Sequence, residues 1–307
     1  MSTLAALALA LLTSSTPRTD TTVAVTTGTR LELENLMGDV SVDAWTRSSV
    51  RIVASHGRGS TVSVELDHGS LMISAEGRMG APTTVDYQLT VPQWMAVQLS
   101  GMDGDIKVSG TRGTIHAETV KGDVKIEGGS GAITVASIEG TVRVEATRGN
   151  VEATSVNQDV WVIGVTGPLT AESVNGQVVL DRVASPRIEA SSVNGNVMFT
   201  GTIVPSGAYH FSSHNGHLRV GLAEAANVSV DATTYQGGVH SAIGRSFEVV
   251  KKGRRYRMKL GMGAASMELE SFNGRILLDT PEAIQKLIAR YQAGDELEDE
   301  SEDENDE

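Results

Sequence analysis

Residues 104–149 read GDIKVSGTRGTIHAETVKGDVKIEGGSGAITVASIEGTVRVEATRG, and a glycine returns at every ninth position of this stretch. The same slot continues to residue 176, with Gln158 as its one replacement. Its occupants are Gly104, Gly113, Gly122, Gly131, Gly140, Gly149, Gln158, Gly167 and Gly176. So regular a spacing predicts a repeat architecture in which one short unit stacks on the next.

Two kinds of nine-residue unit alternate, so the full period is 18 residues. One kind has two large apolar residues two positions apart: Ile106/Val108, Val124/Ile126, Val142/Val144, Val160/Val162, Val178/Leu180 and Val197/Phe199. The other has a large residue, a small one, then Ser or Thr: Ile115/Ala117/Thr119, Val151/Ala153/Ser155, Leu169/Ala171/Ser173 and Ile188/Ala190/Ser192. Alternation with period two predicts short strands with one buried face. We therefore predict an all-β fold, a parallel β-solenoid with 18-residue coils made of two nine-residue units.

The corners of the repeat carry small turn residues, as in Val174-Asn175-Gly176 and Val193-Asn194-Gly195. Glycine reaches positive φ without a steric penalty, so we expect these glycines to supply the sharp bends between strands. The scarcity of aromatic residues, 4% of the chain, is consistent with a thin interior filled by Val, Ile and Ala.

The solenoid domain is predicted at residues 22–279, with regular repeats at about 102–241. After Gly195 the spacing loosens, and residues 246–261 predict a hairpin insertion that turns at Lys251-Lys252-Gly253. Residues 281–292 predict a short amphipathic helix with Pro281 at its first position. We expect this helix to cap the C-terminal end of the solenoid and the N-terminal strands to cap the other end.

Residues 1–16 predict a signal peptide, because an apolar run from Leu4 to Leu12 precedes small residues that suit cleavage. No Lys or Arg precedes that run, and a short buried helix or a misassigned start are the alternatives. The prediction places the protein in the secreted, periplasmic or cell-envelope class. No second apolar stretch is long enough for a transmembrane anchor in the mature chain.

The net charge of −13 is concentrated at the C-terminus. Residues 295–307 hold ten of the 38 acidic residues and no base, and the other 28 nearly balance the 25 basic residues. We expect this acidic tail to be disordered. The nearly neutral body argues against a nucleic-acid partner, and the absence of cysteine excludes disulfides and thiolate sites.

Four motifs, in this order, carry a resemblance to a known family. They are Gly38-Asp39-Val40-Ser41-Val42-Asp43-Ala44-Trp45, Tyr87-Gln88-Leu89-Thr90-Val91-Pro92, the serial Val-Asn-Gly corners, and Gly261-Met262-Gly263 followed by Asn273-Gly274-Arg275-Ile276-Leu277. Over about residues 22–279 the chain resembles the bacterial putative-adhesin family of β-strand-repeat domains, a β-solenoid domain of unknown function. The resemblance implies an envelope protein and supplies no catalytic residues.

Metal and enzyme sites have weak candidates in this sequence. His210, His214 and His217, with His240 later, form the best metal-like group, although surface histidines near a turn are the simpler interpretation. Asp105, Asp123 and Asp159 suggest calcium in the turns, but Lys107 and Lys125 beside them favour a solvated face of mixed charge. Glu118, Glu152, Glu172 and Glu189 recur outward, and a row of them would suit a carbohydrate-active enzyme. We predict no cofactor and no catalytic residue.

Two surfaces are candidates for partner binding. In successive large-pair units the outward residue is Trp161, Val179 and Met198, which stacking would bring into one apolar column. That column is either exposed or covered by a loop or the C-terminal helix. The second surface is the basic run Lys251, Lys252, Arg254, Arg255 and Arg257, which suits an anionic glycan, a lipid headgroup or the acidic tail, or simply protects a strand edge.

The leading hypothesis is a non-enzymatic binding or scaffold module, an adhesin that uses its extended repeat surface. Its expected partner is a surface polysaccharide or another envelope protein. The alternatives are a carbohydrate-active β-helix enzyme and a structural solenoid that self-associates.

Overall fold

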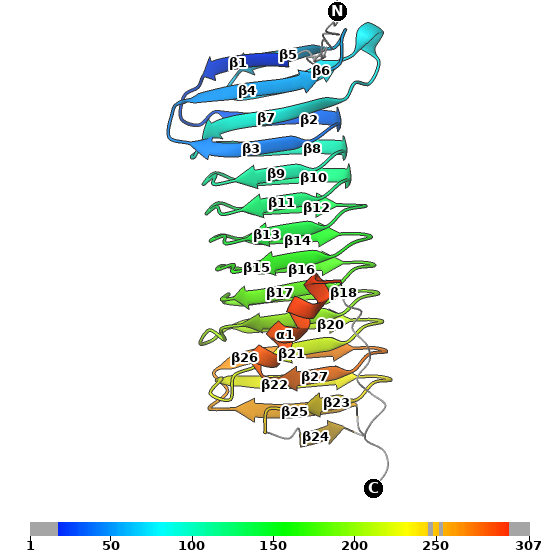
Figure 1. The fold of residues 1–307 in the computed structure, drawn as a ribbon. Helices are drawn as coiled ribbons and strands as arrows, with labels where there is room; N and C mark the ends of the chain where they lie inside the picture. The colour runs from blue at the N-terminus through cyan, green and yellow to red at the C-terminus, as the bar shows by residue number, and fades with distance from the viewer. Residues whose placement is uncertain (1–17, 245–247, 252–253, 295–307) are drawn as a thin grey trace, which may run out of the picture.

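The computed structural model describes residues 18–244, 248–251 and 254–294, which form two long sheets lying face to face (Figure 1). Sheet A has the spatial order β1 (Arg18–Ala24), β4 (Ser49–His56), β7 (Val85–Pro92), β3 (Val40–Trp45), β9 (Ile106–Ser109), β11 (Val124–Glu127), β13 (Val142–Glu145), β15 (Val160–Ile163), β17 (Val178–Val183), β19 (Val197–Gly201), β21 (Leu218–Gly221), β27 (Ile276–Asp279) and β23 (Val239–Ser241).

Sheet B has the order β24 (Glu248–Lys251), β25 (Arg255–Leu260), β22 (Val228–Thr234), β26 (Ala265–Ser271), β20 (Ala208–Ser213), β18 (Arg187–Ser192), β16 (Leu169–Ser173), β14 (Val151–Ser155), β12 (Ile133–Ser137), β10 (Ile115–Lys121), β8 (Ala96–Asp103), β2 (Arg30–Met37), β6 (Ser70–Glu76) and β5 (Thr61–Asp67). A short 3-10 turn at Arg78–Gly80 and helix α1 (Pro281–Gln292) complete the described elements. The β-solenoid prediction, with its short C-terminal helix, is confirmed.

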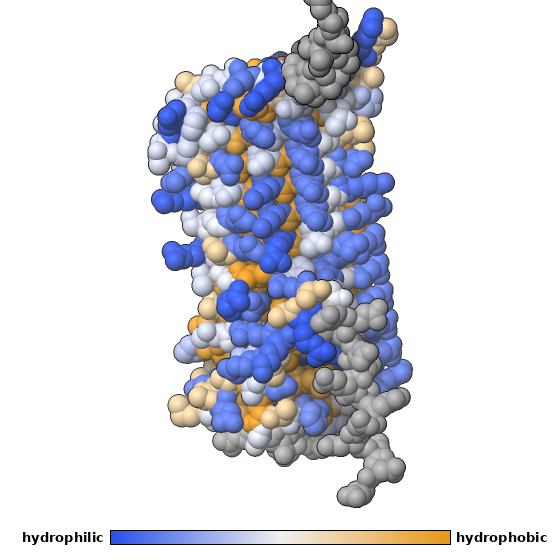
Figure 2. All heavy atoms as spheres, in the orientation of Figure 1, coloured by the Kyte–Doolittle hydropathy of each residue, from blue (hydrophilic) through white to orange (hydrophobic). Residues whose placement is uncertain are grey.

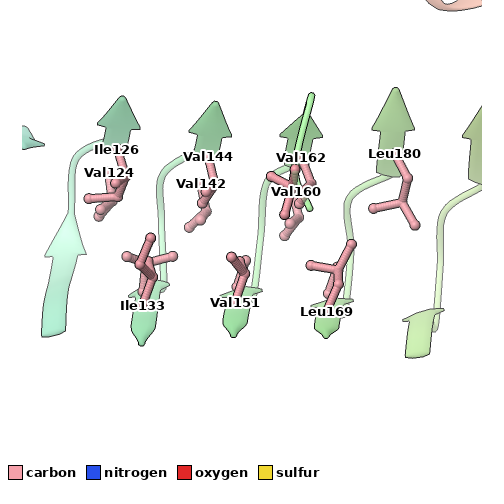
Figure 3. Packing of buried hydrophobic residues seen from close by; sticks show 14 of the residues in the cluster. Val124, Ile126, Ile133, Val142, Val144, Val151, Val160, Val162, Leu169 and Leu180 are labelled. Carbon is pink, nitrogen blue, oxygen red and sulfur yellow. The ribbon is translucent and has the colours of Figure 1, made fainter. Parts of the chain in front are cut away.

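Each regular coil contributes one strand to each sheet, and residues 18 apart pair side by side. In sheet A, Val124 pairs with Val142, which pairs with Val160, all in parallel register. The inward-facing pairs predicted from the sequence are buried, and their side chains from the two sheets meet in a single apolar layer (Figure 3). Because equivalent side chains stack at the strand spacing, Val, Ile, Leu and Ala fill most of this interior, and its buried aromatics are Tyr87, Phe199, Tyr209 and Phe211.

The expected role of the corner glycines is wrong for most of them. Within the nine-residue slot, only Gly104, Gly122 and Gly167 have positive φ. At Gly140 the constraint is stacking, because an added Cβ would lie 1.8 Å from the carbonyl oxygen of Gly122 in the preceding coil. At the corner that follows each sheet A strand, positive φ recurs three residues before the slot, at Gly110, Gly128, Ala146 and Gly164, and at the equivalent Arg182.

Polar side chains link each coil to the next at the corner where the sheet B strands end. The buried Ser137 and Ser155 donate their hydroxyls to the carbonyls of Gly122 and Gly140 at 2.8 and 2.9 Å. Carboxylates form a second row, in which Asp105 Oδ1 accepts from the amide of Asp123 at 2.8 Å. These aspartates therefore satisfy backbone donors of the neighbouring coil, and among the described residues no cluster of His, Asp or Glu is arranged to hold a metal ion.

The stack ends in coils whose spatial order differs from their order in the chain. At the C-terminal end β26 and β27 lie between the coil of β20 and β21 and the coil of β22 and β23. At the other end the coil of β2 and β3 lies between two later ones. At one end antiparallel strands close both sheets, with β1 and β4 outside β7 in sheet A and β5 outside β6 in sheet B. At the other end the antiparallel hairpin of β24 and β25 closes sheet B, and sheet A ends in the parallel strand β23.

Helix α1 does not cap the end of the solenoid, as the sequence had suggested. It crosses the outer face of sheet A and packs on β17, β19 and β21 (Figure 1). Its N-cap is Thr280, whose hydroxyl accepts from the amide of Ala283 at 3.3 Å. The apolar stripe of α1 needs an apolar partner, and the Trp161, Val179 and Met198 side chains provide one on the outer face of sheet A.

One buried tyrosine gives the fold a predicted weakness at high pH. Burial raises the pKa of Tyr87 to about 12, and its hydroxyl has no hydrogen-bond partner among the described residues. Above about pH 10 the unfolded chain releases this proton while the folded protein keeps it, so the free energy of unfolding falls by about 1.4 kcal/mol per pH unit from this residue. We expect Tyr87→Phe to reduce that slope in urea unfolding between about pH 10 and 12. An unchanged slope would contradict this assignment.

Candidate functional site

The apolar column predicted on sheet A is not exposed. Trp161 keeps 6% of its surface accessible, and Val179 and Met198 keep none, because α1 lies over them. Trp161 stacks on Tyr291 with ring centroids 5.7 Å apart, and the Tyr291 hydroxyl donates to Asp159 at 2.6 Å. Burial, together with this hydrogen bond, raises the pKa of Tyr291 above its usual range. Of the alternatives that the sequence left open for this column, cover by the C-terminal helix is the one that the structure shows.

The three histidines that suggested a metal site do not converge. His210 lies on the outer face of sheet B, 3.5 Å from a carboxylate oxygen of Glu268. His214 stacks on Phe272 at the corner, with centroids 4.7 Å apart. His217 lies past that corner, where its Nδ1 accepts from the amide of Arg275 at 2.9 Å. Each ring has a separate structural neighbour, and no shared point lies between them.

The basic run is divided between described and undescribed residues. Lys252 lies outside the described part of the chain, and Lys251 ends β24. Arg255 and Arg257 in β25 both contact Asp231 Oδ1, at 3.6 and 3.1 Å, while Arg254 is exposed at the turn. The hairpin is the outermost pair of sheet B, and the shared carboxylate partly neutralises its arginines.

The predicted row of carboxylates is also wrong. Glu118 and Glu172 lie in one outward column of sheet B, with Ala136 and Thr154 between them. Glu152 and Glu189 lie in a second column, separated by Thr170. All four glutamates are exposed, so the carboxylate-lined groove expected for an enzyme is not formed by them.

The corner where each sheet B strand ends lies at the right of the stack in Figure 1. Along this corner the sequence places a row of mostly apolar side chains, called here the corner ridge. Every coil contributes the residue that follows the buried Ser, Thr or equivalent position. In spatial order the corner ridge consists of Leu36, Met102, Val120, Ile138, Val156, Val174, Val193, His214, Phe272 and Tyr235. Ten coils at about 4.8 Å give it a length of roughly 43 Å.

All members of the corner ridge except the half-buried Val156 are exposed, and hydrogen bonds between coils hold the backbone of the ridge. Leu36, Met102 and Ile138 keep 46%, 54% and 44% of their surfaces accessible, and Tyr235 keeps 52%. Amides of the corner donate to carbonyls of the adjoining coil, as in Asn175 to Val156 and Asn194 to Val174, both at 2.8 Å. Apolar side chains so regularly exposed on hydrogen-bonded backbone are typical of a contact surface.

A row of asparagines follows the ridge on its C-terminal half. Asn175 donates to Asn157, Asn194 to Asn175, Asn215 to Asn194 and Asn273 to Asn215, at 2.9, 2.8, 2.8 and 2.6 Å. All five amides are exposed. Each carboxamide has two N–H donors and two acceptor lone pairs, and the row uses only one of each, so every interior member keeps a donor and an acceptor for solvent or a partner.

The outer face of sheet A, unlike the corner ridge, carries charged side chains. Hydrophilic side chains form rows on the part of sheet A that α1 leaves uncovered (Figure 2). Lys125 and Arg143 there are balanced by Glu127 and Glu145, with Lys125 Nζ 2.6 Å from Glu127. The proton affinity of Glu127 falls accordingly, since the hydrogen bond to Lys125 lowers the pKa of this carboxyl.

Comparisons with known proteins found similarity only to solved structures of low sequence identity. No protein-family model matches the chain, and a comparison with curated proteins gave no match. A solved putative cell adhesion protein of Clostridium sporogenes is 10% identical, covers 86% of this chain and all of its own length, and has a TM-score of 0.25. A putative adhesin of Bacteroides fragilis is 13% identical, covers 86% of this chain and 98% of its own length, and has a TM-score of 0.38. A putative adhesin of Parabacteroides merdae is 9% identical, covers 86% of this chain and 96% of its own length, and has a TM-score of 0.39.

The names of these bacterial proteins agree with the family that the sequence motifs resemble. Their identities and TM-scores carry nothing about a ligand, and the fold described above rests on this chain's own strand pairing. Within the described residues, no helix combines the length and apolar character that crossing a membrane requires.

Proposed function

We propose that the protein is a non-enzymatic binding scaffold of the cell envelope or extracellular space, and that its corner ridge binds a linear surface polysaccharide. The observation that carries the proposal is the corner ridge, exposed at nine of its ten positions, on backbone that is hydrogen-bonded from coil to coil. A rigid ridge loses little conformational entropy when a partner binds, which favours association.

The chemistry beside the ridge suits a sugar chain better than an apolar peptide. Sugar rings present C–H faces that pack on aliphatic and aromatic side chains, and their edges carry hydroxyls that donate and accept hydrogen bonds. The ridge offers the first kind of contact, ending in the stacked rings of His214, Phe272 and Tyr235. The asparagine row offers the second kind at the same coil-by-coil interval.

Polar replacement of the ridge should weaken this binding. We expect the triple variant Ile138→Thr, Val174→Thr and Val193→Thr to lower affinity for its polysaccharide about tenfold, since each site loses roughly 0.5 kcal/mol of apolar contact. Threonine keeps the β-branched shape, so folding should be preserved. The measurement is co-sedimentation with a panel of insoluble bacterial polysaccharides, followed by titration of the glycan that retains the protein.

A matched control uses exposed apolar residues away from the ridge. Leu66 and Met72 keep 50% and 39% of their surfaces accessible in β5 and β6, and Leu66→Thr with Met72→Thr should leave binding unchanged. Equal binding by the triple variant and wild type, or retention by no glycan, would overturn the proposal. A concentration-dependent dimer that the triple variant abolishes would favour self-association, and glycan cleavage would favour the enzyme alternative.

A further inference from the structure

The asparagine row extends to the last coil of the stack, where Gln236 occupies the equivalent corner. Thr234 of β22 pairs with Ser271 of β26, and the amide of Gln236 donates to the Phe272 carbonyl at 2.9 Å. Six successive coils therefore present an exposed carboxamide beside the corner ridge. In spatial order this carboxamide row consists of Asn157, Asn175, Asn194, Asn215, Asn273 and Gln236.

The carboxamide row begins where charged residues at this corner end. The three preceding coils carry Asp103, Lys121 and Glu139 at the equivalent position, and Lys121 Nζ lies 3.8 Å from Glu139 Oε2. From Val156 to the last coil, neither the ridge nor the carboxamide row contains Asp, Glu, Lys or Arg. These two rows therefore offer no opposite charge to an ionised ligand, and they favour an uncharged one.

The carboxamides are aligned along the stack. Each asparagine after the first donates to the asparagine of the adjoining coil nearer the N-terminal end, and the corners lie one above another (Figure 1). Coils recur at about 4.8 Å, so the six positions span roughly 24 Å. One pyranose unit of a fully extended glycan is nearly as long as one coil, so such a chain can meet one carboxamide with each unit.

The spare groups of each carboxamide suit a chain whose units alternate. In an extended β-1,4-linked chain each pyranose is turned over relative to the next. Along one edge, ring hydroxyls therefore alternate with a ring oxygen, which only accepts hydrogen bonds, and its hydroxymethyl group. Each interior asparagine keeps one donor and one acceptor, so it can pair with either orientation, whereas a carboxylate could not donate to the ring oxygen. Chains with α-1,4 or β-1,3 linkages coil into helices and would leave a straight ridge after a few units.

We propose that the ligand of the corner ridge is an uncharged, extended β-1,4-linked glycan. The chain lies parallel to the stack, with one sugar unit on each of the six coils of the carboxamide row. The apolar side chains of the ridge pack against the C–H faces of the rings, and the carboxamides pair with their edges. This inference rests on the proposed polysaccharide binding, to which it adds the linkage, the charge and the direction of the chain.

Titration calorimetry of the full-length protein with soluble β-1,4-linked oligosaccharides of two to seven units tests the length of the site. Two uncharged series serve as probes, one of glucose and one of N-acetylglucosamine. We expect affinity in at least one series to rise about threefold for each added unit up to six, because each unit adds about one net hydrogen bond. A seventh unit would lie beside Glu139, outside the carboxamide row, and should add no affinity.

Two single variants move the ends of the carboxamide row in opposite directions. Glu139→Gln extends the row by one coil, so the seventh sugar unit should now add about threefold in affinity. Gln236→Glu removes the last coil from the row, so affinity should level off at five units. Both side chains are exposed, and circular dichroism should show that the fold is kept. Glu152→Gln and Gln98→Glu make the same exchanges at exposed positions of sheet B and should leave the length dependence unchanged.

The outcomes separate this inference from the proposed function on which it rests. Binding of an α-1,4-linked, β-1,3-linked or charged glycan in preference to both β-1,4-linked series, lost in the triple ridge variant, would keep the proposed function and overturn the inference. Affinity that does not depend on ligand length, or that Glu139→Gln and Gln236→Glu leave unchanged, would overturn it as well. Retention by no glycan would overturn both.

Discussion

Gly140→Ala is expected to destabilise the protein by about 3 kcal/mol or more. Its added Cβ would lie 1.8 Å from the carbonyl oxygen of Gly122, whereas ordinary contacts of this kind exceed 3 Å. Moving the backbone apart would break hydrogen bonds, because the Gly140 carbonyl accepts from the Ser155 hydroxyl and the Gly122 carbonyl accepts from the Ser137 hydroxyl. The lost stability should appear as a lower urea midpoint with a similar slope.

Two neighbouring glycines near the end of the stack give a matched comparison for this prediction. A Cβ on Gly237 would lie 1.8 Å from the carbonyl oxygen of Gly274, while one on Gly238 would have nothing within 4 Å. We expect Gly237→Ala to destabilise and Gly238→Ala to be tolerated, although the residues are adjacent. Similar midpoints for Gly140→Ala, Gly238→Ala and wild type would show that stacking does not select the glycines.

Ile288→Asp is expected to release α1 from sheet A. Ile284 and Ile288 keep 4% and 3% of their surfaces accessible against the Trp161 column, and burying such a side chain is worth about 1.5–3 kcal/mol. A 12-residue helix is marginal alone in water, so a detached α1 should also unfold. Released Trp161 should emit at longer wavelength, and the bared apolar column should promote association.

The control for α1 release places the same charge on the exposed side of the helix. Gln285→Asp should leave Trp161 emission and the monomer unchanged, since Gln285 is exposed in the docked helix. Comparison with Trp161→Phe isolates the signal of this tryptophan from Trp45 and Trp94. If Ile288→Asp behaves like Gln285→Asp in emission and in light scattering, the docking contact is not what holds α1.

The sequence predicts the coils well because each coil repeats the same local pattern. Val142 and Val144 alternate with polar residues, and the structure buries both, as it does their equivalents in neighbouring coils. The order of coils at the two ends is not predicted, because β26 carries no local sign of whether it will pair with β20, with β22 or with both. That choice depends on pairing between strands far apart in the chain.

The corner ridge could have been predicted from the valines of the Val-Asn-Gly corners, which were interpreted only as turns. Turn residues are usually small or polar, so Val174 and Val193 at equivalent corners, 19 residues apart, are unexpected there. The outward strand positions indicated a different apolar surface, the column that begins at Trp161. Whether that column is covered depends on where α1 docks, and α1 begins 120 residues after Trp161. The apolar stripe of α1 and the Trp161 column were both visible in the sequence, which left open whether the helix would cover that column or cap the end of the stack.

The exchanged coil order at the C-terminal end has a consequence for how the chain assembles. Strand β22 pairs with β26 and β25, not with β20, so the coil of β22 and β23 has no solenoid surface to join until residues 265–279 have arrived. If coils are added in order from the N-terminus, we expect addition to stop after β21 until the coils of β22/β23 and β26/β27 can be added together. The outer coil of β22 and β23 has no free end from which to detach, because the chain continues from it into the inner coil of β26 and β27. We therefore expect the coils at this end to unfold together rather than one after another.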